Sequence, residues 1–117
     1  MSHDDPTVTD PELYTLIFEN ERVRVLEYRD QPGGRTHRHH HPDSVMVTLS
    51  AFRRRVTAGD RSVDVELGPG EARWLGSQEH AGENIGDSVT HSVFIELKEP
   101  RPDSVATAGS PLGPSSS

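Results

Sequence analysis

Short runs of alternating apolar and polar residues limit most strongly what this chain can fold into. Alternation with a period of two is typical of a β-strand with one buried and one solvated face, and almost no segment has helical periodicity. Clusters of turn-forming residues separate the runs, so we predict an all-β sandwich or barrel. The runs are residues 23–28, 45–50, 63–67 and 92–97, and the turn clusters are residues 20–21, 31–34, 58–60, 68–70 and 84–87.

The composition indicates one folded unit between two polar ends. The 117 residues suffice for one domain, and only 31% of them are hydrophobic. Residues 1–12 include four acidic residues and two prolines, and residues 100–117 are rich in Pro and Ser. Such segments bury too little apolar surface to offset their chain entropy. We therefore predict a disordered arm at 1–12, a barrel at 13–99 and a disordered tail at 100–117.

Composition and charge also exclude several classes of function. The chain has no cysteine, which excludes disulfides, thiolate metal ligands and thiol nucleophiles. Its longest apolar run, residues 13–18, is far too short to span a bilayer, and we see no secretory signal, so we expect a cytoplasmic protein without a membrane partner. The net charge of −7 argues against nucleic acid as a partner. We interpret the basic cluster at residues 53–55 as a solvated strand edge, with anion binding as the alternative.

Histidines concentrate in residues 33–41, which read Gly-Gly-Arg-Thr-His-Arg-His-His-His, and another histidine follows at position 80. His39 and His41 project to the same side of an extended segment, because successive side chains alternate. A third imidazole from His80 would complete a metal site with open positions for a substrate. The alternative is a polar loop that binds metal only adventitiously. Imidazole suits several divalent metals, so Fe, Zn, Ni, Mn and Cu all remain candidates.

The chain resembles the cupin family, whose members are small jelly-roll barrels with two histidine motifs. Gly33, five further residues and the His39–His41 triplet fit the opening of the first motif. Gly70, Gly76, His80 and Asn84 fall at the spacing of the second motif. The resemblance covers roughly residues 22–97. It implies a single-domain double-stranded β-helix, with His39, His41 and His80 as metal ligands.

The chain also departs from the family's motifs. Ser44 stands in the slot of the metal-binding glutamate, so the family's fourth ligand does not carry over. Gly76 and Gln78 replace the proline and glycine of the second motif. The chain is most similar to small bacterial single-domain cupins of unassigned role, some of which are named as β-alanine degradation proteins. They share the stretches at residues 42–45, 70–75 and 80–84, but no substrate follows from that name.

Three further residues are candidates for roles in catalysis. His37 has the same parity as His39 and His41, so it can act as an acid or base, a spare ligand or a solvated residue. Gln78 lies two residues before His80 and can approach a metal or substrate through its amide oxygen, or be an ordinary loop residue. His91 shares the parity of the apolar residues at 93, 95 and 97. We therefore expect His91 to face the barrel interior, as a fourth ligand, a proton shuttle or a residue at the barrel mouth.

These residues favour a metal-dependent enzyme. Without a glutamate ligand, neutral imidazoles leave the full divalent charge on the metal, which favours anionic ligands. We expect Lewis-acid chemistry of the lyase, isomerase or cyclase type on a small oxygen-rich or anionic molecule. The alternatives are an Fe(II)-dependent dioxygenase and a non-catalytic module that binds a small molecule. Barrels of this size often protect their edge strands by pairing, so we also expect a homodimer.

Overall fold

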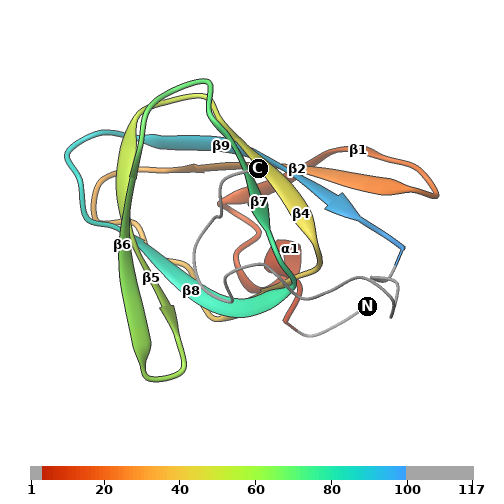
Figure 1. Ribbon diagram of the computed structural model, residues 1–117, viewed down its shortest axis with the longest axis horizontal. Helices are drawn as coiled ribbons and strands as arrows, with labels where there is room; N and C mark the ends of the chain where they lie inside the picture. The colour runs from red at the N-terminus through yellow and green to blue at the C-terminus, as the bar shows by residue number, and fades with distance from the viewer. Residues whose placement is uncertain (1–3, 100–117) are drawn as a thin grey trace.

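Two antiparallel sheets that curve around a shared interior make up the computed structural model, which describes residues 4–99 (Figure 1). One sheet has the strand order β1-β2-β9-β4-β7 and the other has the order β3-β8-β5-β6. Non-consecutive strands are therefore neighbours in both sheets, as in a jelly roll. The elements are α1 (Pro6–Thr9), β1 (Tyr14–Glu19), β2 (Val23–Asp30), β3 (His39–His41), β4 (Ser44–Thr48), β5 (Phe52–Ala58), β6 (Arg61–Leu67), β7 (Ala72–Leu75), β8 (Gln78–Asn84) and β9 (Thr90–Leu97).

Two of the predicted turns are stabilised by the glycine and asparagine residues in their sequences. In the β5–β6 hairpin, Ala58 pairs with Arg61 across a two-residue connection in which Gly59 has φ +63°. Such left-handed backbone strains any residue with a side chain, and glycine adopts it freely. Between β1 and β2, the side chain of Asn20 accepts hydrogen bonds from two backbone N–H groups further along the turn, at 2.8 and 2.9 Å. Each of these turns joins two neighbouring strands of one sheet and fixes their register.

The interior of the barrel is a mixture of aromatic and polar side chains. Along β9, the buried residues are Thr90, Ser92, Phe94 and Glu96, whereas the alternate positions are only partly covered. The aliphatic residues of β9 therefore face outward, whereas Phe94 and most of its polar residues face inward. The buried hydrophobic cluster around this polar interior consists of Tyr14, Leu26, Tyr28, Met46, Phe52, Leu67, Leu75 and Phe94.

The segment assigned from sequence to a disordered arm contains α1 and packs against the barrel from residue 4 onward. Asp5 caps α1 by accepting a hydrogen bond from the backbone N–H of Thr7, and its carboxylate pairs with Arg24 on β2 at 2.8 Å. Asp10 is fully buried. Polar residues in this segment thus find partners on the barrel, which composition alone does not reveal. The predicted tail at 100–117 lies outside the described residues. No helix among those described is long and apolar enough to cross a membrane.

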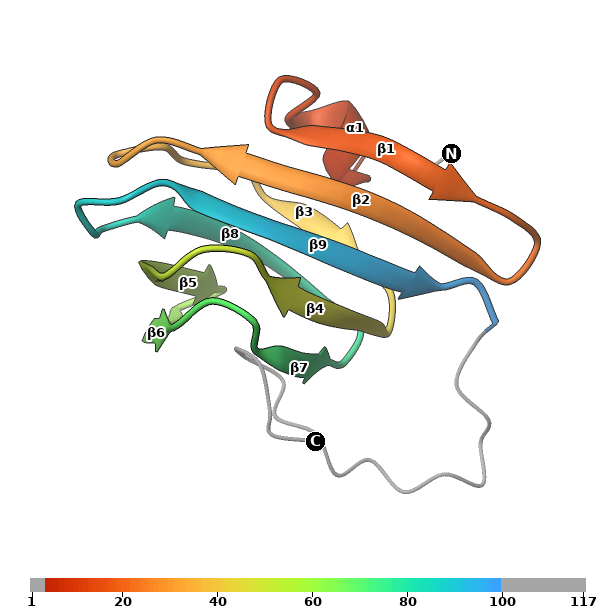
Figure 2. The same cartoon turned by 90° about the horizontal axis from the view of Figure 1, so that it is seen from above.

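The outer face of the five-stranded sheet carries an apolar row. Figure 2 shows β1, β2, β9 and β4 side by side in this order. The register aligns Phe18 with Val25, Val25 with Ile95, and Ile95 with Val45. Phe18 is 54% exposed, and the other three are partly exposed. An apolar row of this kind across neighbouring strands is typical of an interaction surface.

We propose that a second copy of this chain covers the apolar row, which would produce the homodimer expected from the sequence. Residues 100–117 are poorly suited to cover it, because Val105 and Leu112 are their only large aliphatic residues. An Ile95→Glu substitution should convert the dimer to monomer, since it places a charge in the middle of the contact. Val63→Glu is the matched control, because Val63 is exposed on the other sheet. Sedimentation equilibrium measures both, and a monomeric wild type at tens of micromolar would refute the proposal.

Candidate metal centre

Three histidines from two strands meet inside the barrel. The register of β3 and β8 places His39 directly opposite His80 and His41 opposite Gln78. His39 and His41 are buried on the inner side of β3, as their alternation predicts. His40 points the other way, toward the hydroxyl of Ser77. One ring nitrogen from each of His39, His41 and His80 lies within 4.8 Å of the other two, so this cluster has the donor set of a metal site.

Hydrogen bonds orient all three rings in the same sense. The Nδ1 atoms of His39, His41 and His80 each lie 2.8 Å from an oxygen that can only accept. Each Nδ1 must therefore carry the proton and donate it, which leaves each Nε2 with a free lone pair. Such outer partners fix the tautomer and direction of metal-ligating histidines. The acceptors are, respectively, the backbone carbonyl of His37, the carboxylate of Glu96 and the side-chain amide of Gln78.

The partner of His41 belongs to a longer chain of charges. Glu96 is buried, and its second oxygen accepts hydrogen bonds from Arg24 Nε at 3.0 Å and Nη2 at 2.8 Å. Arg24 also pairs with Asp5, in the segment that contains α1. Burial raises the pKa of Glu96, whereas Arg24 acts to lower it. The N-terminal segment is thereby connected to the orientation of His41.

Burial keeps the three imidazoles in their neutral form. Desolvation lowers the pKa of His39 below its ordinary value of 6.5, and it lowers the pKa of His41 and His80 well below that value. The neighbouring imidazoles add to the lowering for His41 and His80. Neutral rings with free Nε2 lone pairs are the state that a metal requires. The three residues therefore fit a divalent ion in donor type, direction and protonation.

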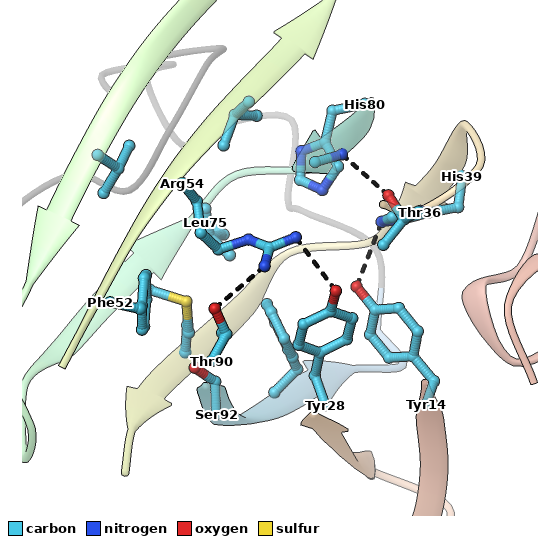
Figure 3. Close-up of a pocket in the computed structure, with 15 residues that line it drawn as sticks. Tyr14, Tyr28, Thr36, His39, Phe52, Arg54, Leu75, His80, Thr90 and Ser92 are labelled. Carbon is cyan, nitrogen blue, oxygen red and sulfur yellow. Dashed lines mark hydrogen bonds between the residues drawn. The ribbon is translucent and has the colours of Figure 1, made fainter. Parts of the chain in front are cut away.

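A cavity of about 70 Å³ opens beside the cluster and is lined by His39, His80 and Tyr14 among others (Figure 3). The hydroxyl of Tyr14 lies 3.4 Å from Nε2 of both His39 and His41. Elsewhere in the cavity wall, Ser92 is buried, and its hydroxyl has no hydrogen-bond partner among residues 4–99. A buried hydroxyl without a partner is costly, which marks this wall as a place where a ligand oxygen can bind.

Arg54 supplies the buried positive charge of the cavity wall. Its guanidinium donates to Asp30 at 2.7 Å and Thr90 at 3.1 Å from Nη1, and to Tyr28 at 3.1 Å from Nη2, and Figure 3 shows it reaching toward Thr90 and Tyr28. A side chain at Gly82 would lie 2.9 Å from Nη2, so glycine leaves room for this arrangement. The interpretation of residues 53–55 as a solvated edge is therefore wrong for the central arginine, since alternation along β5 turns it inward.

The structure places the three predicted catalytic residues away from the cavity. His37 has a 77% exposed side chain, and its ring bonds to Asp10 at 2.8 Å, so it serves the cluster only through its backbone carbonyl. Gln78 is buried, but its amide oxygen is engaged by His80. The expectation that His91 faces the interior is wrong, because its parity on β9 is the outer one, where its Nε2 meets Glu27 at 2.6 Å.

Sequence reasoning missed the groups that complete the site, which are Tyr14, Arg54, Glu96 and Ser92. Tyr14 lies outside both histidine motifs, and nothing in its local sequence marks it. Glu96 and Ser92 occupy the alternate positions of β9 that carry mostly polar residues. In a strand with one solvated face, such positions are expected to face solvent. Phe94 could have indicated that this parity is buried, because it is a large aromatic residue that alternates with the aliphatic ones. Ser44, in the slot of the family's glutamate, is buried, and its hydroxyl donates to the carbonyl of Pro42.

Comparison with known proteins supports the fold. No protein-family model matches the sequence, and no curated protein matches it. Among solved structures, a cupin domain from Bordetella pertussis Tohama I is 33% identical, with a TM-score of 0.69, and the match covers 74% of this chain and 93% of that one. The polyketide cyclase RemF from Streptomyces resistomycificus is 17% identical, with a TM-score of 0.57, over 81% of this chain and 72% of that one. At 17% identity, this second match shows the fold alone.

The buried imidazoles predict that the metal-free protein loses stability in mild acid. Their pKa values are lower in the folded state than in the unfolded state, so the unfolded chain binds more protons as the pH falls below about 6.5. The free energy of unfolding should fall between pH 7.5 and 5.5, by up to about 1.4 kcal/mol per pH unit for each excluded imidazole. Urea titrations with a chelator present measure it.

His37 is the internal control for this experiment. Asp10 raises the pKa of His37, so its protonation stabilises the fold as the pH falls and opposes the effect of the buried rings. Burial of Glu96 acts in the same opposing sense, though nearer to the ordinary pKa range of a carboxyl group. A His37→Gln variant should therefore lose stability more steeply than the wild type. Stability that stays constant or rises from pH 7.5 to 5.5 would show that the three rings are not held neutral.

Proposed function

This chain belongs to the cupin family, and on that premise we propose that it is a metal-dependent enzyme whose ion is held by His39, His41 and His80. The observation that carries the proposal is the convergence of one ring nitrogen from each of the three histidines within 4.8 Å, together with the hydrogen bonds at Nδ1 that leave each Nε2 free. Three nitrogen donors suit Fe, Zn, Ni and Cu alike. When bound, such an ion acts as a Lewis acid that polarises a carbonyl or carboxylate group of the substrate.

The size and the polar lining of the cavity favour a small substrate that carries oxygen atoms. Its volume of about 70 Å³ is roughly half that of an engineered cavity of about 150 Å³ that holds benzene. This leaves room for only a few non-hydrogen atoms, which is too little for a polyketide. Arg54 and the unpartnered hydroxyl of Ser92 are polar groups in the wall. We infer that the substrate is a small acid or hydroxy acid, with one oxygen group near the metal and the other near Ser92.

The protein's own groups bind and orient this substrate. Arg54 is held in place by Asp30 and Thr90, so little conformational entropy is lost when it meets an anion. The apolar side chains of Met46, Phe52 and Phe94 complete the wall and exclude water from the bound molecule. Non-oxidative chemistry of the lyase, isomerase or cyclase type is our first choice. The alternative is an Fe(II)-dependent dioxygenase, which the absence of a carboxylate ligand among the described residues also permits.

Metal binding is the first test of this function. Protein made without a histidine tag should contain about one divalent ion per chain by elemental analysis. Chelator should lower its melting temperature, because a ligand at 100 times its Kd stabilises the folded state by about 2.7 kcal/mol. His41→Gln should abolish both effects, whereas His91→Gln should change neither, since His91 lies on the outer face. Absence of metal together with a melt that chelator does not shift would refute the proposal.

The substrate class is tested by ligand binding to the metal-loaded protein. Calorimetric titrations should show that oxalate, malonate and glycolate bind at least tenfold more tightly than uncharged amides of the same size. Ser92→Ala should weaken the binding of these acids about 2- to 10-fold, the equivalent of losing one hydrogen bond of about 0.5–1.5 kcal/mol. Ser62→Ala, at an exposed site on β6, is the control. Equal affinity for acids and amides would contradict this class.

Turnover assays then separate the candidate functions. Metal-loaded protein should convert a small hydroxy or oxo acid without consuming dioxygen, as measured by product analysis and an oxygen electrode. Oxygen uptake that requires Fe(II) and the same acid would instead indicate the dioxygenase. Tight binding without conversion of any such acid would favour the non-catalytic module that the sequence left open.

A further inference from the structure

The metal site lacks the carboxylate that the family's first motif supplies. Ser44 occupies that slot, but its hydroxyl is turned away and donates to a backbone carbonyl at 2.9 Å. The nearby acids are also engaged. Both oxygens of Glu96 are used, by His41 and by Arg24, and both oxygens of Asp10 bind the backbone N–H of His37. Neither of these two buried carboxylates is therefore free to become a fourth ligand.

Tyr14 brings an oxygen to the cluster from outside both motifs. Its side chain is 5% exposed and lines the same cavity as His39 and His80. Its hydroxyl is equidistant, at 3.4 Å, from Nε2 of His39 and Nε2 of His41, and Figure 3 shows it directed at His39. These two nitrogens are the ones that the Nδ1 hydrogen bonds leave free for a metal. At 3.4 Å, a hydrogen bond to either is weak, so a hydrogen bond alone poorly accounts for this position.

The two distances match those between ligands of one metal ion. Ligand atoms about 2.1 Å from a tetrahedral centre lie about 3.4 Å apart. The position of the Tyr14 hydroxyl relative to His39 and His41 therefore agrees with that of a neighbouring ligand.

We propose that the phenol oxygen of Tyr14 is the fourth protein ligand of the ion held by His39, His41 and His80. The proposal rests on the proposed function, because it requires that an ion binds there. If the ion binds, the phenol would have to lose its proton to solvent, although burial raises the pKa of Tyr14. The oxygen would then contribute the single negative charge that a glutamate would otherwise supply. A divalent site then keeps a net charge of about +1, which still favours an anionic substrate.

The fold holds Tyr14 firmly in this position. Its backbone lies opposite Tyr28 in the register of β1 and β2, and the two ring centroids are 4.7 Å apart. On another side, its ring contacts Phe94, with centroids 6.0 Å apart. At the start of β1, the backbone N–H of Tyr14 donates to the carbonyl of Asp10. Tyr28 provides a matched control, because it is equally buried but its hydroxyl binds Asp30 and Arg54 instead.

Copper(II) is the probe for the test, because a phenolate bound to it gives a visible charge-transfer band and resonance-enhanced tyrosinate ring vibrations. Imidazole ligands alone give neither signal. Untagged, metal-stripped wild type should show both with one equivalent of copper, and Tyr28→Phe should retain them. Tyr14→Phe should lose both signals and bind copper at least tenfold more weakly in competition with a chelator. Circular dichroism establishes that each variant is folded.

The outcomes separate this proposal from the proposed function. Stoichiometric copper binding by the wild type without a tyrosinate signal would overturn the role of Tyr14 and leave the three-histidine site intact. The same conclusion follows if Tyr14→Phe keeps the signal. Failure of the wild type to bind copper, or any other divalent ion tested in its place, would overturn both proposals. The wild-type spectrum decides the matter even if a variant fails to fold.

Discussion

The interior of this protein depends on holding three neutral imidazoles in fixed orientations away from water. Each ring must donate from Nδ1 to an acceptor, because only then does Nε2 carry a free lone pair. The acceptors are a backbone carbonyl, an amide and the carboxylate of Glu96. A buried carboxylate in turn requires a cation, which Arg24 supplies, and Arg24 also pairs with Asp5 near the N-terminus. The orientation of His41 therefore depends on a series of contacts that runs from the histidine cluster to the N-terminal segment.

This requirement explains why β9 turns mainly polar residues inward and its aliphatic residues outward. A barrel that encloses three imidazoles, charged groups and a cavity places Thr90, Ser92 and Glu96 inward. The alternate residues of β9 then form an apolar outer face. In a monomer such a face would be poorly solvated, whereas a covering partner would bury it. The polar interior of β9 and the apolar outer row that the proposed homodimer would cover are therefore two consequences of the same strand parity.

Most of the fold was predictable from sequence because its signals are local. Period-two alternation, the turn glycines and the histidine spacing each report on a few neighbouring residues, and the structure confirms the all-β barrel and the meeting of His39, His41 and His80. What alternation cannot report is which face is inside. His91 is assigned inward because the apolar parity of β9 is taken as the buried one, although the structure buries the other parity. The error at position 54 has a different cause: three consecutive arginines are taken together as a solvated cluster, although Arg54 shares the parity of Phe52 and Val56.

The amino-acid sequence by itself determined the element type, the turns and the pairing of His39 with His41, since backbone geometry and side-chain alternation act within a single strand. Only the tertiary structure decided which oxygens and charges surround them. Tyr14, Arg54 and Glu96 come from three different strands, and they meet because the order β1-β2-β9 and the opposing sheet close around one interior. Contacts between residues so far apart in the chain arise from sheet closure, which no local pattern encodes.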